Sequence, residues 1–213
     1  MKVTTCLNPL HTCLAVFGCL LNFETIWQEM NDEDLKALVN RIGYVEGMPV
    51  VTDPGIMSPR TFLGEVLTVR LPNCFLPDTP QRIATDTSQK LSIRFGETIK
   101  AYLEKGMDVS NLKGIALVEA GWLRYLMGVD DNGSEMAISP DPRLDEMKSR
   151  LAGVSFGHNE NAEKALTPIL EDESIFGVSL VKAGLADSVI EHFKRMNAAP
   201  GAVRAEIHSV AIA

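Results

Sequence analysis

The sequence predicts a single, mainly α-helical domain built as a multi-helix bundle. Apolar residues recur at spacings of three and four through most of the chain, as they do on the buried face of a helix. Capping residues, prolines and short polar turns separate these segments. No alternating run of apolar and polar residues is long enough to predict a strand. The 213 residues, 46% of them hydrophobic and 23% charged, suit one globular domain with a buried core.

Four helices are expected in the N-terminal half, over residues 11–30, 34–42, 59–71 and 81–105. Asn31 or Asp32 can cap the second of these helices, because either side chain can accept a hydrogen bond from a free backbone N–H. Ser58 and Pro59 form a capping residue and first-turn proline at the start of the third. A break near Asp86 is compatible with the fourth.

The C-terminal half is expected to contain a central helix and four further ones, over residues 109–128, 143–153, 160–170, 185–197 and 201–210. The first is strongly apolar, which predicts burial on all sides. Residues 129–143 carry the Asp-Asn-Gly and Pro-Asp-Pro signals of exposed turns. The best strand candidates are residues 45–51 and 176–181, and both are short.

The charge pattern and the glycine pattern exclude two classes of function. The net charge is −8, and the basic residues are spread along the chain, so no basic stripe is available for a nucleic acid backbone. No phosphate-binding glycine motif follows a predicted strand, and no P-loop is present. We therefore expect no nucleic acid partner and no dinucleotide site of the usual kind in this chain.

The opening segment, MKVTTCLNPLHTCLAVFGC, has two interpretations. Lys2 followed by an apolar run is typical of a lipoprotein signal peptide. The run is interrupted by Asn8, Pro9 and His11, and its continuous part over residues 13–21 is too short to span a bilayer. We favour the start of a helix in a cytoplasmic protein with no membrane partner.

The four cysteines, Cys6, Cys13, Cys19 and Cys74, form no CxxC pair. Buried free thiols in a reducing compartment are the simplest interpretation. A metal site formed by Cys6, His11 and Cys13 is the alternative, but it lacks a second ligand pair at zinc-finger spacing. No metal is expected.

Two groups of residues could perform chemistry. Asn8 and His11 are three residues apart and would share a helix face, although Asn8 before a proline could equally be a helix cap and His11 a core histidine. Lys2, considered alone, would be an ordinary exposed terminus.

The second group is a ladder of alternating charge. Arg82, Asp86 and Lys90 follow one another at four-residue spacing, and Arg94 extends the series. On a helix they would form either a solvated salt-bridged face or a cationic pocket for hydroxyls or a carboxylate.

Several longer motifs resemble one enzyme family. KVTTCLNPLHTCLAVFGCLLNFETI is similar to the segment that follows the cofactor domain in the polyol-specific long-chain dehydrogenases, which include mannitol dehydrogenases and the fructuronate and tagaturonate reductases. DTSQKLSIRFGETIKAYL resembles a second family helix, with an arginine eight residues before its lysine. GWLRYLMGVDDNG, ESIFGVSL and PGAVRAEI resemble later landmarks, so the resemblance covers the chain in order. It implies the helical C-terminal substrate domain of these enzymes, a fold like that of the 6-phosphogluconate dehydrogenase C-terminal domain.

The resemblance also implies roles for individual residues. Lys2 would be the general base, Asn8 would donate to the developing oxyanion, and His11 would hold a substrate hydroxyl. The substrate-binding residues would be Arg82, Lys90 and, as a further cation suited to a carboxylate, Arg94. No metal is implied, because the lysine replaces zinc as the activator.

This sequence departs from the family pattern in two ways. Five residues separate Lys2 from Asn8 where the family has four, and one extra residue turns a helix by about 100°. The family's N-terminal Rossmann domain is also missing, so residues 1–213 are expected to be the C-terminal substrate-binding and catalytic half, with NAD bound mainly by a Rossmann half supplied in cis or in trans.

The expected function is that of an NAD-dependent oxidoreductase that interconverts a sugar acid and its keto form. D-mannonate and D-fructuronate are the preferred pair, and altronate and tagaturonate the next. A mannitol or fructose dehydrogenase domain is one alternative, and a non-catalytic helical interaction or dimerisation module is another. The isolated chain is expected to be inactive or weakly active.

Overall fold

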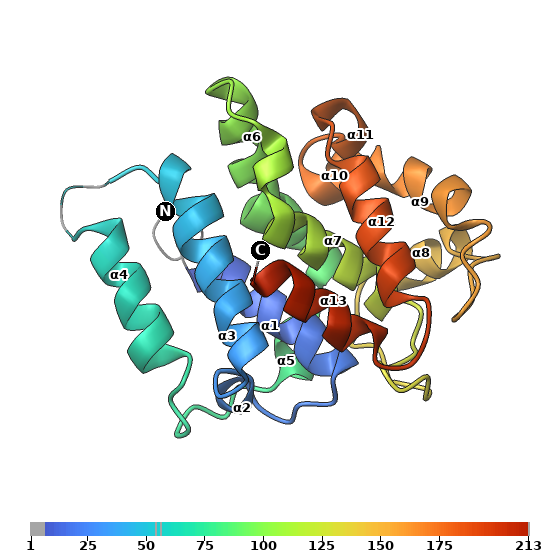
Figure 1. The fold of residues 1–213 in the computed structure, drawn as a ribbon, viewed down its shortest axis with the longest axis horizontal. Coiled ribbons are helices and arrows are strands. Elements are labelled where there is room, and N and C mark those ends of the chain that lie inside the picture. The colour runs from blue at the N-terminus through green and yellow to red at the C-terminus, as the bar shows by residue number, and fades with distance from the viewer. Residues whose placement is uncertain (1–6, 54, 56, 213) are drawn as a thin grey trace.

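The computed structural model describes residues 7–53, 55 and 57–212 and confirms the mainly helical prediction (Figure 1). The α-helices are α1 (Asn8–Leu20), α2 (Ile26–Glu29), α3 (Glu33–Asn40), α4 (Pro59–Glu65), α5 (Pro80–Ala84), α6 (Glu97–Glu104), α7 (Lys113–Tyr125), α8 (Leu144–Arg150), α9 (Ala162–Leu170), α10 (Glu173–Phe176), α11 (Leu180–Ala183), α12 (Ala186–Met196) and α13 (Ala202–Ala211). Turns of π-helix form η2 (Arg41–Gly47), η4 (Val66–Arg70) and η6 (Ser92–Gly96), and turns of 3₁₀-helix form η3 (Met48–Val50), η5 (Thr87–Gln89) and η7 (Val109–Asn111). Across these residues the only extended pairing is two isolated bridges, Val129 with Glu135 and Ser155 with His158. None of the described helices is long and apolar enough to cross a membrane.

Helix α7 lies at the centre of the bundle, as its apolar sequence predicts (Figure 1). Every residue from Gly114 to Tyr125 is buried. Helices α1, α12 and α13 pack around α7, while α4 lies at one end of the molecule and α8 to α11 lie at the other. A Cβ atom on Gly121 would stand 2.7 Å from the ring of Phe17, so a residue without a side chain is needed where α7 meets α1.

The beginning of α7 is fixed by the buried carboxylate of Glu46. Its two oxygens accept hydrogen bonds from the backbone N–H groups of Gly114 and Ile115, at 2.7 and 2.9 Å. Arg41 donates to the same carboxylate at 2.9 Å. Burial raises the pKa of Glu46, although the two amide bonds and the Arg41 charge oppose that rise. This arrangement satisfies donors that a helix start otherwise leaves free.

The first predicted helix is wrong in its length. Helix α1 ends at Leu20, ten residues before the predicted end at residue 30, and α2 is a separate short helix. Asn22 adopts a left-handed conformation with φ 60°, which ends α1, and Thr25 and Gln28 form a capping box that begins α2. Asparagine tolerates the left-handed region better than most residues, so the chain can turn there.

The second helix begins where predicted and ends later. Asp32 is its cap, and its side chain accepts from the N–H of Leu35 at 3.0 Å. The helical path continues beyond Gly43, through the π-helical η2 and the 3₁₀ turn η3, to Val50. The strand candidate over residues 45–51 is therefore wrong.

Two further predictions are corrected in the C-terminal half. The strand candidate at residues 176–181 is instead the end of α10 and the start of α11, where Gly177 turns the chain with φ 78°. The turn at residues 129–143 is not fully exposed, since Asp130 and Asp131 are buried. Asp131 accepts from the N–H of Val203 at 2.7 Å and so caps α13.

Candidate active site

The two sequence-predicted residues of α1 lie in its first turns. Asn8 is the first residue of the helix rather than its cap, because Leu7 occupies the capping position without a side-chain hydrogen bond. The Asn8 amide is half-buried and makes no hydrogen bond with the residues that the structure describes. His11 is also half-buried, and its Nε2 atom lies 3.8 Å from Oδ2 of Asp78. Both side chains are accessible from the surface at this end of α1.

The electrostatic surroundings keep the His11 imidazole neutral. Burial lowers its pKa to about 4, and the charges of Arg94, Arg70 and Arg82 add to the effect. The contact with Asp78 is too long for a hydrogen bond, and with a neutral ring it is not an ion pair at pH 7. A neutral imidazole can both donate and accept a hydrogen bond, which suits the orientation of a hydroxyl group.

The predicted charge ladder is wrong because the chain does not form one continuous α-helix there. Helix α5 ends at Ala84, and Asp86 adopts a left-handed conformation with φ 54°. The break near Asp86 is thus confirmed, and the regular face that would have aligned Arg82 with Lys90 does not exist. The amide of Asp86 donates to the carbonyl of Pro140 at 2.9 Å, so a distant segment holds the break.

Lys90 turns back onto the end of α5. Its Nζ donates to the carbonyl oxygens of Ile83, at 3.1 Å, and Thr85. Burial and the charge of Arg94 lower its pKa, while Asp86 and Asp141 oppose the change. An ammonium group has three donors, so one remains for a ligand.

Arg94, on the π-helical η6, faces α1. Its Nη1 donates to the hydroxyl of Thr12, and that hydroxyl in turn donates to the carbonyl of Asn8 at 3.1 Å. Burial lowers the pKa of Arg94 to about 10, so it remains charged at neutral pH. No carboxylate among the described residues forms an ion pair with it. Arg94 is therefore a half-buried cation whose charge is not neutralised by a direct partner.

Among the predicted site residues that the structure describes, Arg82 is the most exposed. Its guanidinium forms an ion pair with Asp78, four residues earlier, and 63% of its side chain is exposed. The carboxylate of Asp78 thus pairs with Arg82 and also lies near the His11 ring. The structure brings His11 into one electrostatic neighbourhood with three basic residues, Arg82, Lys90 and Arg94, which we call the cationic cluster.

Three residues of this neighbourhood were missed from the sequence: Thr12, Asp78 and Arg70. Thr12 follows His11 directly, and Asp78 is four residues before Arg82, a spacing at which an ion pair could have been predicted. Arg70 lies on η4, and only the tertiary fold brings its charge near His11.

Asp141 holds the turn that precedes Lys90 of the cationic cluster. Its carboxylate accepts from the backbone N–H of Ser88 at 2.8 Å and from the Ser88 hydroxyl at 2.5 Å. This holds the 3₁₀ turn η5, which leads into Lys90.

Two predicted residues, Lys2 and Cys6, lie outside the described residues. Cys13 and Cys19 are buried free thiols, and Cys74 is an exposed one. Burial raises the pKa of Cys19 to about 12, which leaves this thiol protonated. Within the described ranges, no group of three His, Cys, Asp or Glu side chains could hold a metal ion.

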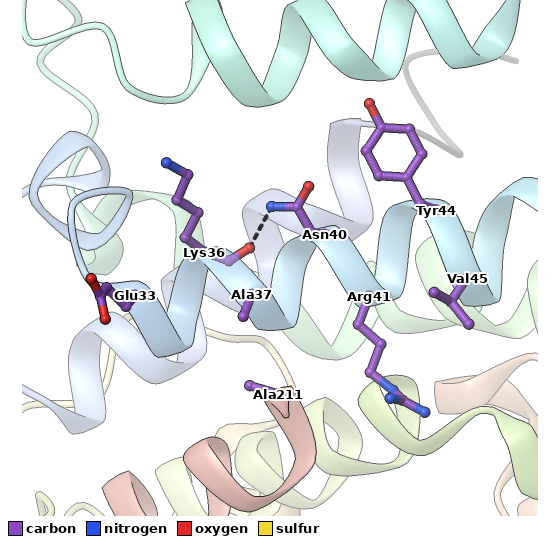
Figure 2. Close-up of a pocket in the computed structure, with 8 residues that line it drawn as sticks. All are labelled: Glu33, Lys36, Ala37, Asn40, Arg41, Tyr44, Val45 and Ala211. Carbon is purple, nitrogen blue, oxygen red and sulfur yellow. Dashed lines mark hydrogen bonds between the residues drawn. The ribbon is translucent and has the colours of Figure 1, made fainter. Parts of the chain in front are cut away.

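A cavity of about 560 Å³ lies elsewhere, along α3 and η2 and beside the end of α13 (Figure 2). Lys36, Asn40 and Tyr44 extend from one side of the α3–η2 segment, and Arg41 extends from the opposite side, where α13 lies. Its described lining contains no residue of the cationic cluster.

Comparison with known proteins identifies the family. The profile of the mannitol dehydrogenase C-terminal domain matches residues 1–197. A D-mannonate oxidoreductase from Thermotoga maritima is 56% identical over 211 residues, which are 99% of this chain and 39% of the relative. The chain belongs to the mannitol dehydrogenase C-terminal domain family.

Other members of the family are more distant. A D-mannonate oxidoreductase from Escherichia coli K12 is 28% identical over 78% of this chain and 33% of the relative. The solved mannitol 2-dehydrogenase of Pseudomonas fluorescens, a ternary complex with NAD and D-mannitol, superimposes with a TM-score of 0.79 at 22% identity, over 99% of this chain and 39% of that one. The mannitol dehydrogenase C-terminal domain fold is thus shared, and this chain spans between a third and two fifths of the length of these relatives.

Proposed function

We propose that this chain is the substrate-binding and catalytic half of a cytoplasmic NAD-dependent oxidoreductase that interconverts D-mannonate and D-fructuronate. The single observation that carries the choice of a sugar acid is Arg94, a half-buried guanidinium bonded to a hydroxyl and not to a carboxylate. A buried cation without a counterion is costly, so a ligand carboxylate is its natural partner. The 56% identity to a D-mannonate oxidoreductase supports the same substrate.

In this proposal each residue of the chain has a defined task. Arg94 and the free donor of Lys90 bind the carboxylate, and Arg82 bounds the entrance. Neutral His11 orients a substrate hydroxyl, and the amide of Asn8 donates to the oxygen of the reacting carbon. Lys2, by family resemblance, takes the hydroxyl proton as general base.

NAD accepts the hydride in the proposed reaction. The described residues do not fit this cofactor by themselves, because they form no parallel sheet with a glycine-rich turn leading into a helix. A nucleotide-binding domain, joined to this chain or supplied by another, would have to hold it.

Ligand binding tests the role of Arg94. The change Arg94→Gln removes the charge but keeps a donor, and it should weaken D-mannonate binding about tenfold or more, since a charge-assisted hydrogen bond contributes about 1.5–3 kcal/mol. Binding of neutral D-mannitol should change little. Arg150→Gln, on the distant α8, is the matched control and should leave both affinities unchanged. Equal loss for D-mannonate and D-mannitol would contradict the assignment of Arg94 to the carboxylate.

The reaction itself is tested by NADH oxidation with fructuronate, tagaturonate and fructose. The chain alone and a fusion that places a family nucleotide-binding domain ahead of Met1 should be compared. We expect activity in the fusion only, and greatest with fructuronate. A folded fusion that is silent with all three would favour the non-catalytic helical module, and a preference for fructose would favour the mannitol dehydrogenase alternative.

A further inference from the structure

A second polar cavity lies on the C-terminal side of the bundle, where η7, α12 and α13 meet the start of α7. Its volume is about 270 Å³. The side chains around it are three hydroxyls, from Ser110, Ser188 and Ser209, and three basic groups, from Lys113, His192 and Arg195. None of these residues belongs to the cationic cluster around His11.

Two cations, Lys113 and Arg195, line the cavity in a protein whose net charge is −8. Lys113 forms no ion pair with a described residue. Arg195 lies 3.4 Å from the carboxylate of Glu206. Two permanent cations therefore line the cavity, and Lys113 is paired with neither of the two carboxylates that contact its lining, Glu206 and Asp108.

The carboxylate of Glu206 is already hydrogen-bonded to another side chain of the protein. Its Oε1 accepts from Nδ1 of His192 at 2.6 Å. Burial alone would raise the pKa of Glu206, but the hydrogen bond and charge of His192, with the charge of Arg195, lower it overall. The carboxylate is thus ionised and hydrogen-bonded to the imidazole.

His192 is the buried wall of the cavity, with only 8% of the residue exposed. Because Nδ1 is hydrogen-bonded to Glu206, the ring orientation is fixed, and Nε2 has no hydrogen-bond partner among the described residues. The carboxylate of Asp108, beside the cavity, accepts a hydrogen bond from the backbone N–H of Ser110 at 2.9 Å. This bond partly compensates its negative charge.

We propose that this cavity binds a small oxyanion, with a phosphate group as the best chemical match. A guanidinium, an ammonium and three hydroxyls supply donors from several directions, as a tetrahedral anion requires. The volume is below the roughly 300–1,000 Å³ of pockets that enclose drug-sized ligands, which suits one small group. This assignment does not depend on the proposed oxidoreductase function.

The test is titration of the full chain with inorganic phosphate, by calorimetry and by thermal unfolding, at constant ionic strength set with chloride. We expect saturable binding and a rise in Tm. Lys113→Gln and Arg195→Gln should each weaken binding about tenfold, and Ser209→Ala a few-fold. All three side chains are exposed, so the variants should fold, which circular dichroism can verify. Lys182→Gln, another exposed lysine, is the matched control and should bind as the unmodified chain does.

The cationic cluster is the competing location, and a second variant separates the two. Phosphate binding that is lost in Arg94→Gln and kept in Lys113→Gln would overturn the proposal. A Tm rise produced equally by chloride would also overturn it, because it would reflect screening of the net charge and no site.

Discussion

Arg94 and His11 depend on each other through charge and burial rather than through a direct bond. The guanidinium is held by Thr12, the neighbour of His11 in sequence, so both side chains are positioned by one turn of α1. The Arg94 charge and partial burial together disfavour a proton on His11. The same side chain can therefore attract a carboxylate and keep the adjacent imidazole neutral.

The depressed pKa of His11 has a measurable effect on stability. An unfolded histidine takes up its proton near its ordinary pKa of 6.5, whereas folded His11 resists protonation until about pH 4. Between these values the unfolded state binds more protons, so the free energy of unfolding falls as the pH falls. The full stability is present above pH 6.5, and about 2 kcal/mol of it should be lost by about pH 5.

Urea denaturation at about pH 7.5 and about pH 5 measures this effect against His11→Gln. The variant lacks the titrating group, so its stability should fall by about 2 kcal/mol less than that of the unmodified chain over the same interval. His158→Gln removes an exposed imidazole and serves as the control. An identical pH dependence for the unmodified chain and His11→Gln would show that His11 titrates alike in both states.

At the scale of elements, the sequence predicted helices well and their junctions poorly. The capping residue Asp32 and the central position of α7 followed from local chemistry and from apolar periodicity. The left-handed residues Asn22 and Asp86 interrupt patterns that remain helical in composition on both sides. Asp86 is held by Pro140, far along the chain, so no local window contains the cause of the break.

The candidate site shows the same division. His11 and Arg94 could be selected by residue type, spacing and family resemblance. Asp78 and Arg70 could not be associated with His11 from spacing, because their approach depends on how α5 and η4 lie against α1. The cavity around Lys113 is lined by residues of four elements, and no local sequence pattern predicts it.

Gly96 lies where η6, the element that carries Arg94, packs against α10. A Cβ atom on Gly96, in η6, would lie 2.1 Å from the backbone oxygen of Phe176 in α10. Backbone cannot move aside as a flexible side chain can, so Gly96→Ala should lower the free energy of unfolding by about 1–3 kcal/mol. Chemical denaturation measures the change.

Gly64→Ala, in α4, is the matched control for Gly96→Ala. The nearest atom to its added Cβ is the Tyr44 hydroxyl oxygen at 3.5 Å, which is ordinary contact. It should stabilise the protein by about 0.5–1 kcal/mol, because alanine favours the helix over glycine. A Gly96→Ala variant as stable as Gly64→Ala would show that η6 and α10 are not in close contact.

At the scale of the whole molecule, the cationic cluster is a local exception to the overall charge. The chain has a net charge of −8, yet Arg82, Lys90 and Arg94 lie together at one end of α1 and α5. The molecule as a whole repels an approaching anion, and only local groups of cations attract it. Specificity for the anion must therefore come from short-range contacts, which salt screens less than the long-range field.

This balance predicts how salt affects ligand binding. Raising NaCl from roughly 50 to roughly 500 mM should weaken D-mannonate binding about two- to fivefold, because the partly exposed cations are screened while the half-buried Arg94 is screened less. D-mannitol carries no charge, so its affinity should not change. Arg82→Gln should reduce the salt dependence, since Arg82 is the most exposed cation of the cluster, and Lys182→Gln should not. Equal salt dependence for both ligands would contradict recognition of the carboxylate by charge, and calorimetric titration at the two salt concentrations distinguishes these outcomes.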